Sequence, residues 1–356
     1  MTQIAMIGDL HFGVKGGDKH FLEFQVNYMK AKLKDMAARG IKTLYQLGDA
    51  VDNRKRSDTT VLDALIEVAN YAHEECGITI VFLVGNHNTF YTDTNSVHNL
   101  NVLKHHPGVL IVEEHQYFAE HDVLVLGWIH KNNHDELMQV VEQSTAKYCL
   151  MHAEFNGFQM YNGIEAKGGM SVVPFRKFKK VYTGHYHTVS EDGNVLYAGS
   201  PYALTWMDYV DGTNRGYFIL DTATGDCEMI KNDTSETLFA VENYDPNKTY
   251  TEADFEPLKN KVVKFFVKDV VDTKHFDGFV KLVNGVSYID RRIIDERELA
   301  IVEHSNIDLR ALNLTPVKVI DEYVRAEAEA NELNSDDVSE EALQLYNTAI
   351  AQLTKV

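Results

Sequence analysis

The feature that most constrains this chain is a short apolar segment that ends in glycine and is followed at once by polar residues. The pattern occurs three times near the N-terminus: residues 4–7 lead into Gly8 and Asp9, residues 43–47 into Gly48 and Asp49, and residues 80–84 into Gly85 and Asn86. Short apolar runs of this kind are typical of buried parallel strands, whose carboxyl ends meet at one edge of a sheet. The sequence therefore predicts three strands that carry polar side chains to the same edge.

Two later segments complete this set of polar residues. Residues 147–151 precede His152, and residues 179–183 precede Gly184-His185-Tyr186-His187. An Asp or His after a strand is most often a turn residue or a helix cap, so each fragment alone is weak evidence for a binding site. Read in order, however, the fragments spell D-x-H, GD, GNH, H and G-H-x-H, a combination that is hard to obtain by chance.

Carboxylate and imidazole side chains gathered in one place are suited to metal-assisted hydrolysis. Cleaving a phosphodiester requires neutralising charge on the phosphoryl oxygens, making a nucleophile from water near pH 7, and assisting the departing alkoxide. Two divalent ions about 3.5 to 4 Å apart meet the first two needs and help with the third. Asp49 is the candidate bridge between two ions, since a carboxylate has two oxygens, and the donor set suits manganese, iron or zinc better than calcium.

Length and composition describe a globular chain with room for a substantial core. With 356 residues, 44% of them hydrophobic, we expect one large domain plus a smaller attachment. The chain enters a strand almost at once and has no run of 18 apolar residues, so we expect a soluble, cytoplasmic protein that is neither secreted nor membrane-spanning. Cys76, Cys149 and Cys227 are few and widely spaced, which favours reduced core thiols over disulfides or a zinc site.

The charge of the chain limits how it could bind a polyanion. The net charge is −19, and the last 62 residues alone carry 14 acidic and 5 basic side chains. An acidic chain is a poor stand-alone binder of nucleic acid, because phosphate contacts need local Lys and Arg. If the substrate is a polyanion, bound metal ions, local basic clusters or a partner must supply the positive charge.

The order of the expected elements predicts an α/β fold. Amphipathic helices over residues 19–39 and from residue 57 or 58 to residue 77 separate the first three strands, which predicts an α/β sandwich with largely parallel pairing. A short helix is expected at 95–104, strands within 117–129, and a helix at 133–144. After His187 the pattern changes to hairpins with turns at 190–194 and 224–226.

Three domains are expected. Residues 1–245 form the main domain, 246–296 a small α+β cap of strand, helix and strand, and 297–356 a linker and helical tail. Apolar stripes on the two tail helices either fold back onto the chain's own domain or dock on a partner; the stripe residues are Val317, Ile320, Val324, Leu343 and Tyr346.

The ordered motifs resemble those of the calcineurin-like metallophosphoesterase superfamily, whose fold is a β-sandwich flanked by helices. The resemblance implies that Asp9, His11, His187 and Asp49 hold one ion, and that Asn86, His152, His185 and Asp49 hold the other. It also implies that the Asn86 amide steadies a phosphate oxygen, and that His87 contacts the scissile phosphate and protonates the leaving oxygen.

One position departs from the usual motif. Asn88 stands where the nuclease branch of the superfamily usually has aspartate. An aspartate could orient and charge-stabilise His87, whereas Asn88 could only hydrogen-bond it. The histidines outside the motifs are expected at ordinary surface or packed positions.

Two further segments point to one branch of the superfamily. The sequence Asp9-Leu10-His11-Phe12-Gly13 before a long helix, and residues 196–201 (LYAGSP) after G-H-x-H, resemble the double-strand-break repair nucleases, nearest to the nuclease subunits of bacteriophage recombination endonucleases and similar to SbcD of bacteria. The resemblance is residue-specific over about residues 1–205 and architectural beyond.

The family resemblance carries expectations about activity and partners. It implies 3′-to-5′ exonuclease and endonuclease activity on DNA that depends on two divalent ions, manganese or alternatively magnesium. It implies an SMC-like coiled-coil ATPase docked on the tail, a homodimer within a heterotetramer, and a location in the host cytoplasm for a phage-encoded chain. Arg54 is a candidate DNA contact.

Other interpretations stay open. Two basic clusters either contact DNA or are solvated surface: Arg54, Lys55 and Arg56, and Arg176, Lys177, Lys179 and Lys180. The chain could instead be a small-molecule or nucleotide phosphodiesterase of the same fold, or a catalytically weak scaffold for the ATPase.

Overall fold

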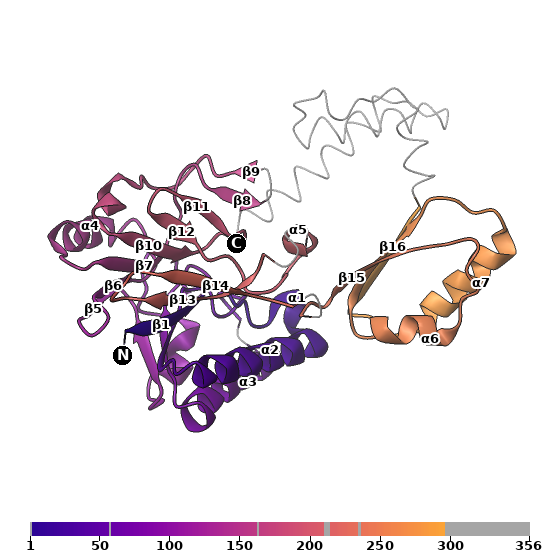
Figure 1. Cartoon of the computed structure of the whole chain (residues 1–356), viewed down its shortest axis with the longest axis horizontal. Coiled ribbons are helices and arrows are strands. Elements are labelled where there is room, and N and C mark those ends of the chain that lie inside the picture. The colour runs from indigo at the N-terminus through magenta and orange to yellow at the C-terminus, as the bar shows by residue number, and fades with distance from the viewer. Residues whose placement is uncertain (1, 57, 162–163, 210–213, 234–235, 296–356) are drawn as a thin grey trace. The chain divides into compact units, whose positions relative to one another are not determined.

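The computed structural model describes residues 2–56, 58–161, 164–209, 214–233 and 236–295 (Figure 1). Its main body is a sandwich of two six-stranded sheets. The first sheet has the order β14-β13-β1-β2-β3-β4, and its strands are β1 (Gln3–Ile7), β2 (Thr43–Gln46), β3 (Thr79–Leu83), β4 (Val109–Val112), β13 (Gly216–Asp221) and β14 (Cys227–Lys231).

The first sheet has the parallel centre that the sequence predicts. Strands β1, β2, β3 and β4 pair in parallel, whereas β13 runs antiparallel to both β1 and β14. The parallel register aligns Ile7 with Gln46 and Gln46 with Phe82, so the polar segments that follow the three strands emerge at one edge. The predicted hairpin between β13 and β14 is confirmed.

The second sheet has the order β11-β12-β10-β7-β6-β5. Its strands are β5 (His115–Phe118), β6 (Val123–Leu126), β7 (Tyr148–His152), β10 (Lys180–Gly184), β11 (Ser190–Asp192) and β12 (Val195–Tyr197). Strands β6, β7, β10 and β12 are parallel neighbours, and Gly184 is in register with His152. This pairing aligns the ends of the two strands that carry the later histidine motifs.

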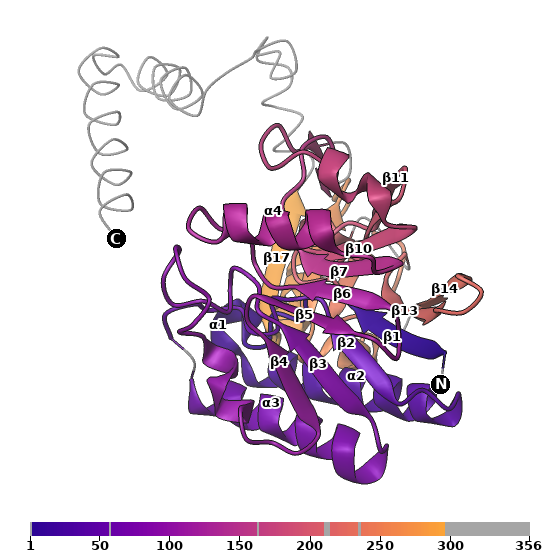
Figure 2. The ribbon, with the colours of Figure 1, turned by 90° about the vertical axis from the view of Figure 1, so that its left-hand side faces the viewer.

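Three buried clusters hold the layers together. The cluster between the sheets joins side chains such as Met6 and Tyr45 of the first sheet to Tyr148 and Leu150 of the second. The second cluster packs helices α2 (Lys19–Ala38) and α3 (Thr59–Asn70) on the outer face of the first sheet. The third packs α4 (His134–Gln143) and the 3-10 turn η3 (Val173–Lys177) on the outer face of the second sheet. Figure 2 shows these layers edge-on, and they confirm the predicted α/β sandwich flanked by helices.

The helices begin and end where local chemistry allows. Asp18 caps α2 by accepting from the backbone N–H groups of His20 and Phe21 at 2.9 and 3.0 Å, and the chain leaves the helix through Gly40, whose φ is +79°. The predicted second helix continues from α3 into a π-helical turn η1 (Tyr71–Glu75) before Gly77. The helix expected at 95–104 is only a 3-10 turn, η2 (Asn99–Leu103).

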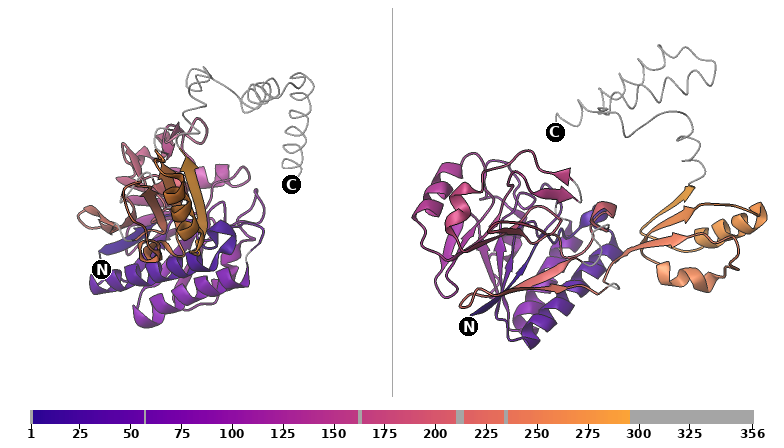
Figure 3. Two further views of the ribbon diagram at one scale, coloured as in Figure 1. Left: turned by 90° about the vertical axis from the view of Figure 1, so that its right-hand side faces the viewer. Right: turned by 45° about the horizontal axis from the view of Figure 1, so that its top comes forward.

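A separate three-stranded sheet follows the sandwich. Its order is β15-β16-β17, with β15 (Phe239–Asn243), β16 (Val262–Val267) and β17 (Asp290–Asp295), and it is accompanied by α6 (Glu252–Phe255), η4 (Glu256–Leu258) and α7 (Thr273–Asn284). Figure 3 shows α7 beside these strands, and the Phe279 ring of α7 lies 5.8 Å from that of Phe265 in β16. Strand β15 was not among the expected elements; it precedes the boundary expected at residue 246 and pairs in parallel with β16.

The remaining described elements are short: α1 (Val14–Gly17), α5 (Trp206–Tyr209), and the hairpin of β8 (Gln159–Tyr161) and β9 (Ile164–Glu165). Cys76 and Cys149 are buried as expected, but Cys227 is exposed because it begins the edge strand β14, so the prediction of a core thiol is wrong there. Among the described helices, none combines the length and apolar character needed to cross a bilayer. The tail stripe from Val317 to Tyr346 lies outside the described residues.

Candidate metal centre

The carboxyl ends of five strands deliver the eight predicted site residues to one place. Asp9 and His11 follow β1, Asp49 follows β2, Asn86 and His87 follow β3, His152 ends β7, and His185 and His187 follow β10. Within the described residues, two groups of ligand atoms built only from these side chains lie within 4.8 Å of one another: Asp9, His11 and His187, and Asp49, His152 and His185. We call them the first and the second cluster.

The glycines of two motifs are required because side chains of the site pack directly against them. A Cβ atom at Gly48 would lie 2.2 Å from Nδ1 of His152, and one at Gly85 would lie 2.3 Å from Oδ1 of Asp49. Gly48 also has a φ of +93°, in the left-handed region that favours glycine. Gly48 and Gly85 therefore make room for the site side chains of His152 and Asp49, whereas Gly8 makes room for the backbone of Gly199.

The backbone is unusual at three of the site residues themselves. His11, Asp49 and His185 have φ values of +45°, +53° and +98°, although none is glycine. Residues in such sparsely populated conformations cost free energy and concentrate at functional sites. The conformation aims each side chain into the site from a strand end.

The first cluster brings two imidazoles against a buried carboxylate. Nε2 of His187 lies 3.2 Å from Nε2 of His11, and both Oδ atoms of Asp9 accept from the backbone N–H of His185 at 2.9 and 3.2 Å. Asp9 is fully buried and His11 is 3% exposed. Two imidazole nitrogens at this separation, beside a carboxylate, match the donors of a single ion.

The second cluster is arranged around the amide oxygen of Asn86. Oδ1 of Asn86 lies 2.9 Å from Nε2 of His152 and 3.0 Å from Nδ1 of His185, and Nε2 of His152 lies 3.2 Å from Oδ2 of Asp49. Nδ1 of His152 is 2.7 Å from the carbonyl oxygen of Leu47, to which its N–H donates. That bond turns Nε2 toward the oxygens of Asp49 and Asn86.

Asp49 lies between the two clusters. Its Oδ2 atom is 3.2 Å from Nε2 of His152 and 3.9 Å from Nε2 of His11, while its Oδ1 atom accepts from the backbone N–H of His87 at 2.8 Å. The carboxylate thus touches a member of each cluster and is 2% exposed. This is the position that a carboxylate shared by two ions needs.

Burial and charge pull the pKa values of the carboxyl groups apart. Burial raises the pKa of Asp9 to about 7, because the ionised form is kept from water. Burial acts in the same sense on Asp49, but the neighbouring His152 outweighs it and holds the pKa of Asp49 well below its usual range. The same attraction overcomes the effect of burial on His152 and raises its pKa to about 9.

The other imidazoles divide in the same way. Burial, together with the nearby His152, lowers the pKa of His185 to about 3, and burial also lowers the pKa of His11. For His187 the adjacent Asp208 outweighs burial and raises the pKa. The converging carboxylates, imidazoles and amide oxygen are a donor set that fits two divalent metal ions, whose binding would replace the protons that His152 and His187 hold beside the carboxylates.

His87 borders both clusters and is oriented by the backbone. It is half-buried, its ring lies edge-on to that of His11 at 4.9 Å, and its Nδ1 atom is 2.6 Å from the carbonyl oxygen of Asp52. Since a carbonyl can only accept, Nδ1 carries the proton of that bond and Nε2 is left as the atom able to exchange a proton.

Asn88 has a different role from the expected one. Its side chain is fully buried, with Oδ1 accepting from the backbone N–H groups of Asp49 and Gly85 at 3.0 and 2.9 Å, and Nδ2 donating to Asn99 at 3.0 Å. Asn88 therefore holds two backbone segments of the site, while the Asp52 carbonyl orients His87. An aspartate here could accept the same two backbone bonds but could not donate to Asn99 while ionised.

Sequence reasoning missed three residues that support the clusters. Oδ1 of Asp52 lies 3.1 Å from Nδ1 of His11, and the two form a third group of potential ligands with His87. Oδ1 of Asp208 lies 3.5 Å from Nδ1 of His187. Arg215, 2% exposed, donates to the carbonyl oxygens of His187 and Ser200 at 2.9 and 3.0 Å.

These supporting residues differ in how visible they are in the sequence. Asp52 comes three residues after Asp49 in a polar segment and could have been suspected. Asp208 and Arg215 follow no strand-glycine pattern, so no local signal marks them.

The two basic clusters have different surroundings. Arg54 donates to the carbonyl oxygen of Thr89 at 3.2 Å, which places it beside the segment that carries His87. In the other cluster, Lys177 donates to the carbonyl oxygens of Val141 and Glu142 at the end of α4, Lys179 donates to that of Thr224, and Lys180 pairs with Glu191. These lysines satisfy the chain's own acceptors, which favours the structural interpretation of this cluster.

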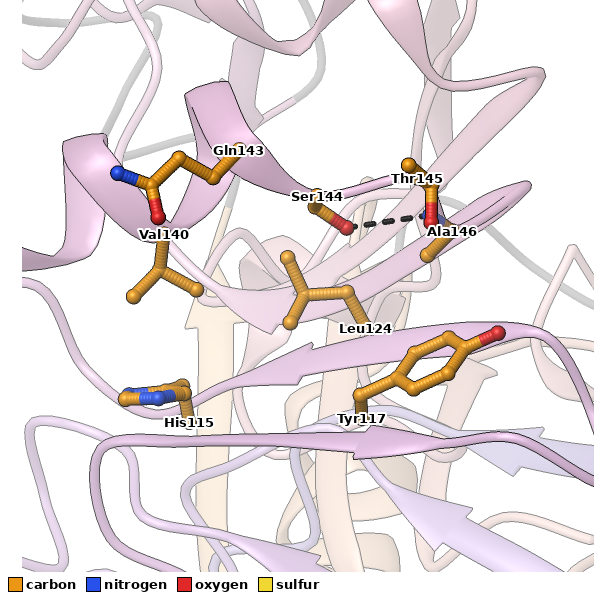
Figure 4. Close-up of a pocket in the computed structure, with 8 residues that line it drawn as sticks. All are labelled: His115, Tyr117, Leu124, Val140, Gln143, Ser144, Thr145 and Ala146. Atoms are coloured by element: carbon orange, nitrogen blue, oxygen red, sulfur yellow. Dashed lines mark hydrogen bonds between the residues drawn. The ribbon is translucent and has the colours of Figure 1, made fainter.

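A pocket on the second sheet does not belong to the centre. Figure 4 shows it between α4 and the strands β5 and β6, lined by His115, Tyr117, Leu124, Val140, Gln143, Ser144, Thr145 and Ala146. Its lining includes no carboxylate and none of the site residues. The pocket therefore offers none of the ligand groups that converge at the strand ends.

Paired clusters of carboxylates and imidazoles lie at the strand ends of a helix-flanked β-sandwich, which is the fold and the pattern of site residues expected from the resemblance to metallophosphoesterases. Over nearly its whole length the chain is similar to exonuclease subunit 1 of Enterobacteria phage T4, with 27% identity over 351 residues that cover 97% of this chain and 98% of the relative. The expected resemblance to nuclease subunits of bacteriophage endonucleases is thereby also confirmed. No protein-family model matches the chain.

Solved structures show only partial likeness. A dimetal phosphatase from Danio rerio is 10% identical with a TM-score of 0.37, over 61% of this chain and 91% of that one. GAP50, the anchor in the inner membrane complex of Plasmodium, is 14% identical with a TM-score of 0.39, over 67% and 91%. Likenesses of this size carry no argument about function.

Proposed function

We propose that the chain is a two-metal DNA phosphodiesterase with 3′-to-5′ exonuclease and endonuclease activity. The observation that carries the proposal is the pair of buried ligand clusters joined by Asp49, with His87 beside both. The similarity to a phage exonuclease subunit over 97% of the chain supports DNA as the substrate. A role as an inactive scaffold is disfavoured, because all eight expected side chains converge.

Each cluster would hold one ion. The ion of the first cluster would be held by Asp9, His11 and His187, and the ion of the second by Asn86, His152 and His185. Both ions would share Asp49. Bound divalent ions neutralise charge on the phosphoryl oxygens and lower the pKa of a water molecule. We propose manganese, with magnesium as the alternative, because imidazole-rich sets suit the former better.

The chain's own residues would position the substrate and move a proton. The Asp52 carbonyl holds Nδ1 of His87, so that Nε2 can donate a proton to the leaving oxygen. Oδ1 of Asn86 faces His152 and His185, which leaves its amide nitrogen as a donor for a phosphate oxygen. Arg54, anchored on Thr89, would attract the DNA backbone at the edge of the centre.

The partner in this proposal is an SMC-like coiled-coil ATPase. The relative is named as a subunit, which supports assembly with another chain. We propose that the tail stripe docks on the ATPase, that the complex is a heterotetramer containing a homodimer of this chain, and that it acts in the cytoplasm of a phage-infected host. Because the chain has a net charge of −19, a partner that supplies positive charge for binding the DNA phosphates agrees with this proposal.

The test is release of nucleotides from end-labelled double-stranded DNA in manganese. Asp49→Ala should lower the rate of nucleotide release by more than about 100-fold, because it removes the metal-ligating carboxylate that both clusters share. Loss of a residue that only supports a ligand would have a smaller effect. Asp63→Ala, at an exposed position of α3, is the matched control and should cleave normally. Equal rates for the two variants would overturn the proposal, and much faster cleavage of a nitrophenyl phosphodiester than of DNA would favour a small-molecule phosphodiesterase.

A further inference from the structure

Two large aromatic side chains are exposed on the loop that follows His87. Phe90 is 41% exposed and Tyr91 is 53% exposed, and their rings meet edge to face with centroids 4.8 Å apart. We call this pair the aromatic rim. Water-facing aromatic side chains that adjoin one another are a common mark of a binding surface, whereas single exposed ones need no explanation.

The rim lies close to the metal centre. Phe90 is three residues beyond His87, so their Cα atoms are at most about 11 Å apart. The intervening Thr89 is buried and its carbonyl oxygen accepts from Nε of Arg54. Nδ2 of Asn99 donates to the carbonyl oxygen of His87 at 3.4 Å. The segment from His87 to Tyr91 is thus fastened beside the segment that carries Arg54.

The loop is fixed from several sides. The N–H of Phe90 donates to the carbonyl oxygen of Val97 at 2.8 Å, and Asn132 donates to that of Asp93 at 3.1 Å. Asn95, which is fully buried, donates to the carbonyl oxygens of Glu113 and Trp128 at 2.9 and 2.8 Å. A surface held in place before it binds loses little conformational freedom on binding.

The ring of Trp128 ties the loop to the second cluster. It lies 5.3 Å from the ring of His185 at an angle of 35°, and its backbone carbonyl is one of the two that hold Asn95. Trp128 therefore contacts both the loop that carries the aromatic rim, through Asn95, and His185 of the second cluster.

Positive charge lies next to the aromatic rim. The backbone N–H groups of Lys55 and Arg56 both donate to Oδ1 of Asn53 at 3.0 Å, which shapes a turn directly after Asp52. Lys55 and Arg56 are exposed, and Arg54 is half-buried against Thr89. Cationic side chains beside exposed aromatic rings form the combination that binds single-stranded nucleic acid, the cations holding phosphates and the rings stacking on bases.

We propose that the aromatic rim is a stacking platform for an unpaired nucleobase of the strand whose phosphate lies in the metal centre. The proposal rests on the proposed function and adds a base-binding subsite to it. Because any base has a π-face, the subsite tolerates every sequence but requires a base that is out of the duplex. It would therefore favour frayed ends and single strands over paired ends.

The test compares oligonucleotides with and without bases. The full-length protein is titrated, without added metal, with a fluorescent single strand and with the same strand carrying abasic sites, and both strands are then cleaved in manganese. For the intact strand, the double variant with Phe90→Ala and Tyr91→Ala should weaken binding by roughly 5- to 150-fold for each stacked base. The variant with Tyr91→Phe, which keeps both rings, should retain most of the affinity of the parent protein. For the abasic strand the double variant should match the parent protein.

Tyr117→Ala is the matched control, since Tyr117 is 50% exposed on β5 in the separate pocket of Figure 4, and it should bind both strands as the parent does. Equal loss of affinity for intact and abasic strands would overturn the stacking platform. So would unchanged binding accompanied by a change of molecular mass in light scattering, which would assign the rim to contact with a second copy of the chain. If the parent protein cleaves no DNA, the proposed function fails instead, and the binding comparison still judges the platform.

Discussion

The two clusters of the metal centre are supported in different ways. In the first, each histidine has a carboxylate behind it: Asp52 lies 3.1 Å from Nδ1 of His11, and Asp208 lies 3.5 Å from Nδ1 of His187. In the second, Nδ1 of His152 donates to the carbonyl oxygen of Leu47 at 2.7 Å, and the carboxylate on that side, Asp9, is farther away at 3.6 Å.

His185 completes the second cluster and packs against the ring of Trp128, with centroids 5.3 Å apart. A carboxylate behind an imidazole makes it a more basic ligand, whereas a carbonyl or a ring mainly fixes its orientation. We infer that carboxylates orient both histidines of the first cluster, whereas a backbone carbonyl and an aromatic ring orient those of the second.

The largest effect should come from removing the charge behind His187. The Asp208 carboxylate is buried beside His187 and Arg215, and breaking such a buried group of charges typically costs about 3 to 5 kcal/mol of unfolding free energy. We expect Asp208→Asn to lose about that much in urea denaturation at pH 7. Glu23→Gln, which removes an exposed pair with Lys19, should lose at most about 1 kcal/mol.

The loss should depend on pH with a definite sign. Burial would raise the pKa of Asp208, but His187 outweighs burial and lowers it to about 2, against 3.8 without the fold. A carboxyl group whose pKa is lowered by folding stabilises the fold at pH values above its ordinary pKa. This contribution is lost as the pH falls through the pKa that the group has in the folded protein. The difference in unfolding free energy between the parent protein and Asp208→Asn should therefore become smaller as the pH falls from about 4 to about 2. A difference that stays constant would contradict a role of Asp208 through its charge.

A smaller loss is expected from crowding the second cluster. In Gly48→Ala the new Cβ would meet the His152 ring at 2.2 Å, in a backbone conformation with φ of +93°. Overpacking and backbone strain together should cost about 2 to 4 kcal/mol. Gly40→Ala is matched in conformation, with φ of +79° and no atom within 4 Å of the new Cβ, and should cost only about 1 kcal/mol. Equal losses in thermal or urea unfolding would show that packing against His152 is unimportant.

These two effects mark what sequence could and could not predict. Parallel strands that end in glycine placed Asp9, Asp49 and Asn86 at one edge, because side chains at strand ends depend on local pattern and sheet order. The reason for the glycine at position 48 is contact with His152, which lies on the other sheet and becomes visible only after the two sheets stack.

Support by distant residues is hidden for the same reason. Asp208 reaches His187 from the short helix α5, well beyond the last motif, so no spacing rule identifies it. The strand β15 was missed because residues 239–243 (FAVEN) change from apolar to polar without alternating and lie before the expected domain boundary. The two lysines bonded to α4 and to Thr224 looked like a basic patch because their acceptors are backbone carbonyls, which no sequence displays.

Metal affinity should separate the two clusters directly. Asp52→Asn removes the negative charge 3.1 Å from His11 but leaves the backbone carbonyl that orients His87. Loss of such a partner typically weakens metal binding by about 10- to 100-fold. Titration calorimetry with manganese should show one site with weakened affinity for the ion and one site with unchanged affinity. Equal weakening of both ions would break the distinction between the clusters, whereas Asp135→Asn, an exposed change on α4, should alter neither.

The smallest effect is expected beneath the second cluster, from Asn88→Asp. Both side chains can accept from the N–H groups of Asp49 and Gly85, so only the bond donated to Asn99 is lost, at a cost of about 1 kcal/mol. Because Nδ1 of His87 is held by the Asp52 carbonyl, the rate of DNA cleavage and its dependence on pH should change by less than about tenfold. A much larger gain would mean that residue 88 governs His87 after all, and that the usual aspartate does more there than hold the two backbone segments together.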